Sequence, residues 1–123
     1  MVRLETIIAV KSVPESSKFY QVLLGLTSKH GGDTFEILAD NNETTVLCLH
    51  KLGEHEHPTM INPNLPSGNG LILFFRVIDL DQIWQNAIEN GFKIEKEPHY
   101  NPNSLKNQFI LRDIDGYYLI ISE

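Results

Sequence analysis

The chain has 123 residues, of which 41% are hydrophobic and 21% charged, as expected for a globular protein with one core. Its net charge of −6 argues against a nucleic-acid partner, because phosphate binding needs clustered lysine and arginine side chains. No apolar run approaches the ~20 residues of a membrane span and no signal peptide is apparent, so we expect a cytoplasmic protein without a membrane partner. Cys48 is the single cysteine of the sequence, which leaves no internal disulfide.

The first half of the chain predicts a strand, a helix and a hairpin. Residues 4–10 are apolar and rich in β-branched side chains, as in a buried strand. Ser12 and Glu15 have the spacing of a capping box, and apolar side chains then recur every three or four residues up to Gly25, a typical C-cap residue. The hairpin strands are expected at 34–39 and 44–50.

The segment 51–69 is rich in proline and glycine and predicts a linker. The second half then repeats the order of the first, with a strand at 71–77, capping-box spacing from Asp79 to Gln82, and a helix up to Gly91. The remaining elements are expected as a strand at 92–97, a polar loop at 98–105, and strands at 108–112 and 117–122. The loop has two interpretations, a lid over a cavity or an ordinary surface loop.

The two halves form an internal repeat. The expected helix starts at Ser12 and Asp79 lie 67 positions apart, and the expected helix ends at Gly25 and Gly91 lie 66 apart. Two copies are too few for a solenoid, so we expect an α+β fold in which two βαβββ repeats form one unit, with a cleft between two similar half-sheets. The half-repeats are expected at 4–50 and 70–122, within a single domain covering 1–123.

Two segments of the sequence resemble a known family. The run FYQVLLGL, from Phe19 to Leu26, is similar to the FYxxvLGL signature of the vicinal oxygen chelate superfamily, which includes glyoxalase I, extradiol dioxygenases and bleomycin-resistance proteins. The run from Asp113 to Tyr117 resembles that family's DPDG turn, with Ile114 in place of the usual proline. The resemblance implies two curled mixed sheets around a shared cavity, and frequently a homodimer.

The resemblance also implies where a metal would bind. In metal-dependent members one ligand, usually histidine, lies seven residues before each helix start, and another, usually glutamate, lies on the last strand of each half. The corresponding positions here are Glu5, Cys48, Ile72 and Ile120. Two of these side chains are aliphatic and donate nothing, whereas catalytic divalent metals need three or four oxygen or imidazole ligands. We therefore expect no metal and no other cofactor.

The same four positions identify the wall of the cavity, because side chains two apart on a strand share a face. The wall so defined is mostly apolar and aromatic with a few polar groups, a mixture that suits a small organic ligand. The candidate ligand-binding residues are Glu5, Ile7, Cys48, His50, Ile72, Phe74, Arg76, Tyr118 and Ile120.

Several of these polar side chains also have structural interpretations. Arg76 could pair with Glu5 or Asp79 instead of a ligand. Cys48 could be a small buried hydrophobe and His50 a hydrogen-bonded or solvated side chain. The further alternatives are Tyr118 as a core residue, Trp84 as helix–sheet core, and the run His55-Glu56-His57 as a solvated loop or, with His50, a nickel or zinc site.

Three functional hypotheses follow. The first is a metal-independent protein that binds an amphipathic or cationic small molecule, similar in role to bleomycin-resistance proteins, and is not an enzyme. The second is an enzyme that uses Glu5 or His50 as a general base near Tyr118 or Arg76. The third is a lyase or dioxygenase-like enzyme with a displaced metal site, its ligands drawn from Glu5, His50, His55 and His57.

Overall fold

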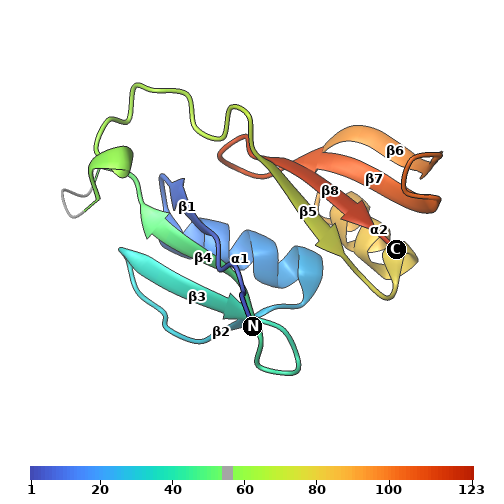
Figure 1. The fold of residues 1–123 in the computed structure, drawn as a ribbon, viewed down its shortest axis with the longest axis horizontal. Helices are drawn as coiled ribbons and strands as arrows, with labels where there is room; N and C mark the ends of the chain where they lie inside the picture. The colour runs from blue at the N-terminus through green and yellow to red at the C-terminus, as the bar shows by residue number, and fades with distance from the viewer. Residues whose placement is uncertain (54–56) are drawn as a thin grey trace. The chain divides into compact units, whose positions relative to one another are not determined.

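The computed structural model describes residues 1–53 and 57–123, and its contacts group the chain into two compact units. The first unit is Met1–Pro66 and the second is Ser67–Glu123, so the boundary falls within the predicted linker (Figure 1). Each unit contains one four-stranded sheet and one long helix. None of the helices in these described residues has the length and apolarity needed to cross a membrane.

The first unit follows the predicted order and adds one strand. Its sheet has the strand order β1-β4-β3-β2, in which β1 runs parallel to β4 and the other pairs are antiparallel. The predicted strand at 4–10 is regular only from Ile7 onward. The extra strand, β2, is two polar residues long and carries no hydrophobic pattern to reveal it. The elements are β1 (Ile7–Val10), α1 (Val13–Leu24), β2 (Thr27–Ser28), β3 (Phe35–Ala39), β4 (Thr45–Lys51) and the short 3₁₀ helix η1 (Pro58–Met60).

The second unit repeats this topology. Its sheet has the order β5-β8-β7-β6, again with one parallel pair, β5 with β8, and antiparallel pairs elsewhere. The elements are β5 (Ile72–Arg76), α2 (Leu80–Glu89), β6 (Lys93–Asn101), β7 (Lys106–Arg112) and β8 (Tyr118–Ser122). The predicted α+β fold of two βαβββ repeats with mixed sheets is therefore confirmed.

Both helices start as the capping-box spacing predicts. The Ser12 hydroxyl accepts a hydrogen bond from the backbone N–H of Glu15 at 3.3 Å, and an Asp79 carboxylate oxygen accepts one from Gln82 at 3.1 Å. Helix α1 ends at Gly25, whose φ of 69° lies in the left-handed region that glycine adopts without strain. The local signals in the two halves thus act through the same contacts.

The prediction of a polar loop at 98–105 is wrong over the first half of that segment. Strand β6 continues through Pro98 to Asn101, so only a short turn remains before β7. Proline is tolerated here because β6 is an edge strand and its pairing with β7 shifts register between Lys96 and His99. His99 pairs with Gln108 within the sheet, and the lid hypothesis loses its basis.

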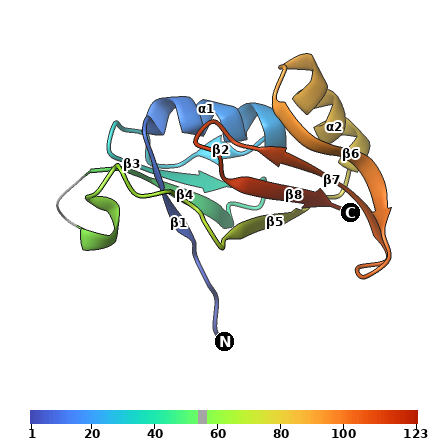
Figure 2. The same cartoon turned by 90° about the horizontal axis from the view of Figure 1, so that it is seen from above.

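In each unit the helix covers one face of its own sheet (Figure 2). In the first unit the buried strand residues Ile8, Leu38, Leu47 and Leu49 alternate with residues of the opposite face. In the second, Trp84 of α2 packs its ring 5.1 Å from that of Phe109, which confirms Trp84 as helix–sheet core. We call the opposite side of each sheet its open face. The first open face contains Ile7, Phe35, Ile37, Cys48 and His50, and the second contains Ile72, Phe74, Arg76, Ile110, Arg112, Tyr118 and Ile120.

Candidate functional site

Strand register brings the predicted site residues together on the two open faces. In the first unit, Ile7 lies opposite Cys48 on β4, and Glu5 precedes β1. In the second unit the register pairs Ile72 with Tyr118 and Phe74 with Ile120, and Arg76 follows on the same face. Each sheet thus assembles the residues that its half of the sequence supplied, and their role in ligand binding stays a prediction.

Cys48 is a neutral thiol. Its side chain is buried, and burial is the largest cause that raises its pKa above the ordinary value. The nearby carboxylates of Glu5 and Glu36 raise the pKa further, because they disfavour a second negative charge. A protonated thiol is a poor nucleophile and a poor metal ligand, so Cys48 acts here as a small buried side chain.

Glu5 faces solvent rather than a buried polar cluster. Its side chain is 43% exposed and forms an ion pair with Arg3, two residues earlier. Water and the neighbouring arginine surround this carboxylate, so it is not held in a desolvated polar cluster. Glu5 therefore lacks the environment that a general base of the second hypothesis requires.

His50 is a buried, hydrogen-bonded histidine. Its Nδ1 lies 3.0 Å from the backbone carbonyl oxygen of Lys51, and since a carbonyl only accepts, Nδ1 is the donor of this hydrogen bond. Its ring also contacts those of Phe35 and His57, with centroid separations of 6.4 and 4.8 Å. His55 of the candidate metal loop lies outside the described residues. Among the residues that the structure does describe, no three His, Cys, Asp or Glu side chains gather as a metal site would need.

Glu36, which the sequence analysis did not single out, is a buried carboxylate on the helix-covered face. Burial acts to raise its pKa, but the hydrogen bonds that it accepts outweigh burial and lower the pKa below 4.5. Its charge is therefore held by donors rather than by a cation, and it ties three segments of the first unit together. The donors are the hydroxyls of Ser17 and Ser28 and the backbone N–H groups of His30, Gly31 and Ile37. The sequence signal that could have identified Glu36 is its charge within the otherwise apolar run from Phe35 to Leu38.

The second open face is organised in three rungs across the sheet. The first rung is aromatic and cationic, the second is apolar apart from its edge residue, and the third is polar. Two shifts in the pairing of β6 with β7, one between Ile94 and Lys96 and one between Lys96 and His99, keep a β6 residue in each of the three rungs. From β5 to β6 the rungs are Ile72, Tyr118, Arg112 and Lys93; then Phe74, Ile120, Ile110 and Lys96; then Arg76, Ser122, Gln108 and His99.

A pocket of about 400 Å³ lies at the first rung. Arg112 is its main polar group: Nε donates to a carboxylate oxygen of Glu95 at 2.8 Å, and Nη1 donates to the carbonyl of Gly116 at 3.0 Å. The guanidinium carbon lies 4.8 Å from the centre of the Tyr118 ring, a cation–π contact. The sequence signal that could have identified Arg112 is its position opposite Tyr118 in the predicted last hairpin. The pocket is lined by Gly68, Asn69, Gly70, Leu71, Ile72, Arg112 and Tyr118.

Arg76 makes neither of the ion pairs considered as alternatives to ligand binding, since Glu5 pairs with Arg3 and Asp79 caps α2. Its Nη1 donates to the backbone carbonyl of Glu123 at 2.7 Å, and its guanidinium carbon lies 5.3 Å from the centre of the Phe74 ring. The open face of the second sheet thus has two arginines, each packed against an aromatic side chain.

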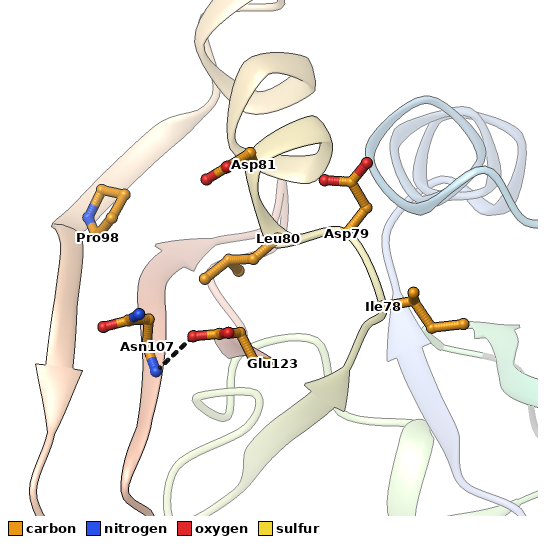
Figure 3. Close-up of a pocket in the computed structure, with 7 residues that line it drawn as sticks. All are labelled: Ile78, Asp79, Leu80, Asp81, Pro98, Asn107 and Glu123. Carbon is orange, nitrogen blue, oxygen red and sulfur yellow. Dashed lines mark hydrogen bonds between the residues drawn. The ribbon is translucent and has the colours of Figure 1, made fainter.

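A second pocket, of about 310 Å³, lies at the start of α2 and is rich in carboxylates (Figure 3). Asp79 caps the helix, and Glu123 accepts a hydrogen bond from the backbone N–H of Asn107 at 2.9 Å. Asp81 lies in the first helical turn, where its negative charge interacts favourably with the helix dipole. These carboxylates have structural roles. The lining residues are Ile78, Asp79, Leu80, Asp81, Pro98, Asn107 and Glu123.

Comparison with solved structures identifies the fold. A protein from the mobile metagenome of V. pseudocholerae is 24% identical, with a TM-score of 0.74 over 99% of this chain and 94% of its own. A possible glyoxalase from Bacillus cereus is 19% identical, with a TM-score of 0.71 over 100% and 99% of the two chains. A lactoylglutathione lyase from Agrobacterium tumefaciens is 18% identical, with a TM-score of 0.72 over 99% and 92%.

The sequence comparisons identify the family through its model rather than through a single relative. No curated protein sequence matches the chain significantly. The family model of the glyoxalase/bleomycin resistance protein/dioxygenase superfamily, however, matches residues 3–121, nearly the whole chain. The protein therefore belongs to the glyoxalase/bleomycin resistance protein/dioxygenase superfamily.

Proposed function

We propose that the protein binds a small amphipathic organic molecule without a metal, on the open face of the second sheet. The observation that carries the proposal is the apolar surface beside the pocket of about 400 Å³: Ile72 is 56% exposed and Phe74 is 44% exposed. Large apolar side chains exposed together beside a pocket with a few polar groups are typical of a binding site. Burial of this surface by a ligand would supply the main favourable free energy of binding.

The donor chemistry at the four family positions supports a metal-independent role. Ile72 and Ile120 offer no lone pair to a metal ion, and the pKa of Cys48 is raised so that its thiol stays protonated. Glu5 is already paired with Arg3. A divalent metal would need at least three good ligands, so these residues do not fit one.

An acid–base enzyme is the second candidate, and one observation favours it. The Lys51 carbonyl engages Nδ1 of His50, so Nε2 is the ring nitrogen left to exchange a proton with a substrate in this buried site. We rank it second because Glu5, the other candidate base, is solvent-exposed and paired with Arg3.

A screen of small amphipathic molecules by thermal shift and NMR would test the proposal. We expect binding to weaken at least about tenfold in Phe74→Glu, because a charge would replace exposed aromatic surface on the open face. Ile88→Glu is the matched control, since Ile88 is exposed to a similar degree but lies on α2. Equal loss in both variants, or none in either, would contradict a site on this face.

Two further measurements address the remaining expectations. Elemental mass spectrometry of untagged protein should find only trace divalent metal, and one equivalent per chain would contradict metal independence.

We also propose a homodimer, as the family resemblance implies. Light scattering after gel filtration should then give twice the mass of the chain.

A further inference from the structure

We infer that the ligand of the second open face is an amphipathic anion, with an apolar body on the middle rung and a carboxylate bound by Arg112. The inference rests on the proposed function, which places a small-molecule site on this face. It concerns the charge of the ligand, which the fold and the family leave open.

Cationic side chains predominate in the rungs of this face, where Glu95 beside Arg112 offsets one of them, although the whole chain is acidic. The chain has a net charge of −6, which alone would favour a cationic ligand. The rungs of the second open face nevertheless carry Arg112 and Lys93 at one end, Lys96 in the middle and Arg76 at the other end. A ligand responds to the potential at its site, so the local cluster favours an anion.

Arg112 is held in place at the pocket by three contacts. Glu95 and the carbonyl of Gly116 engage Nε and Nη1, and the ring of Tyr118 packs against the guanidinium. Within the described parts of the chain, Nη2 makes no hydrogen bond, although Arg112 lines the pocket. Two fixed nitrogens and a stacked ring reduce the entropy that Arg112 would lose when a ligand oxygen binds.

The apolar residues beside Arg112 define the rest of the ligand. Ile72 lies in the same rung, and Phe74 and Ile120 lie in the next one, so an apolar body would extend from the first rung to the second. The pocket volume of about 400 Å³ matches sites for small organic molecules. The expected class is therefore an aromatic or aliphatic monocarboxylate.

Three probes with the same phenyl body test the charge: phenylacetate, phenylacetamide and phenethylamine, each titrated into the 123-residue protein and followed by NMR. We expect phenylacetate to bind at least about tenfold more tightly than the amide, with the amine weakest. Equal binding of all three would overturn the anion inference and leave the proposed function standing. Preference for the amine would also overturn the inference, and failure of all three to bind at millimolar concentration would count against both.

Variants assign the preference to Arg112. Arg112→Gln should reduce phenylacetate binding about tenfold and leave phenylacetamide nearly unchanged, whereas Lys18→Gln, a matched loss of charge on the exposed surface of α1, should change neither. Glu95→Gln removes the carboxylate that competes for Arg112 and should strengthen phenylacetate binding severalfold. This gain cannot result from unfolding. A loss of phenylacetate binding in Glu95→Gln, or an unchanged preference in Arg112→Gln, would overturn the role of Arg112.

Discussion

The two units have the same topology but differ in what they bury and what they expose. Strand pairing aligns Ile7 opposite Cys48 in the first sheet with Phe74 opposite Ile120 in the second. Both open faces bury some side chains, Cys48 and His50 on the first and Gln108 and Ser122 on the second, but the second leaves two large apolar residues exposed, Ile72 and Phe74, where the first leaves Ile7. The repeated fold therefore preserves helix caps and strand register, and the open faces are free to diverge because no helix of their own unit packs on them.

The helix-covered faces differ at one matched position. Glu36 pairs with Leu49 in the first sheet, and Phe109 pairs with Ile121 at the equivalent place in the second. The first unit satisfies a buried carboxylate with hydrogen bonds, and the second packs an aromatic ring against Trp84. The same backbone position thus supports either a polar network or an apolar contact, provided that the helix supplies matching side chains.

The largest effect is expected at Phe109. Phe109→Ala should reduce the free energy of unfolding by about 3–5 kcal/mol, because it leaves a cavity beneath α2 where the ring is fully buried. Denaturant unfolding monitored by Trp84 fluorescence measures the loss. A loss below about 1 kcal/mol would contradict the placement of Phe109 in the core.

The next effect is expected at Glu36, and it depends on pH. Glu36→Gln should cost about 1–3 kcal/mol at neutral pH, because the amide cannot accept all the hydrogen bonds of the carboxylate. The pKa of Glu36 is lower in the folded protein than its ordinary value of 4.5, so its ionisation stabilises the fold above that pH. The stabilisation is lost as the pH falls through the folded pKa.

Unfolding of both proteins at a series of pH values measures this effect. The difference in stability between wild type and Glu36→Gln should shrink as the pH is lowered below 4.5. A difference that stays constant with pH would show that the charge of Glu36 does not contribute.

A third effect is expected at the pocket of the second unit. Gly68 has a φ of 75°, and a Cβ added there would lie 2.5 Å from a ring carbon of Tyr117. Gly68→Ala should therefore cost about 1–3 kcal/mol and shift the segment that lines the pocket. Thermal unfolding measures the cost. Gly70→Ala is the control, because Gly70 has a similar positive φ but an added Cβ would meet no atom within 4 Å, so this variant shows the cost of the backbone conformation without the clash.

The smallest effect compares the two helix caps. Ser12→Ala and Asp79→Ala should each cost about 0.5–2 kcal/mol, because each leaves a backbone N–H of the first turn without its acceptor. Asp79→Ala should cost slightly more, since the carboxylate also interacts favourably with the helix dipole. The pair is measured by denaturant unfolding, and a negligible cost in one half only would show that the repeats have diverged at their caps as well.

The fold was predictable because its signals are local. The spacing from Ser12 to Glu15 and from Asp79 to Gln82 located both helix starts, and the alternation of apolar residues located most strands. Strand β2 and the second half of β6 were missed for a physical reason: edge pairing is set by a neighbouring strand, so a polar pair such as Thr27–Ser28 or a segment containing Pro98 carries no pattern of its own.

The candidate site was less predictable, because its contacts join residues distant in sequence. The two-residue alternation correctly placed Ile72, Phe74 and Tyr118 on one face, since that requires only strand periodicity. The partners of Arg112 depend on the register of β7 with β6 and on the turn at Gly116. No local pattern in the sequence reveals either of these. The network around Glu36 likewise depends on how α1 packs on β3.

Strand β6 has a consequence for self-association. It is the longest strand of the second sheet and lies at its edge, where an unpaired row of backbone groups could join the sheet of another copy. Lysines at 93 and 96, the missing N–H of Pro98 and two register shifts all interrupt that row. Pairing of two copies edge to edge along β6 is therefore disfavoured, while Lys93 and Lys96 remain on the open face.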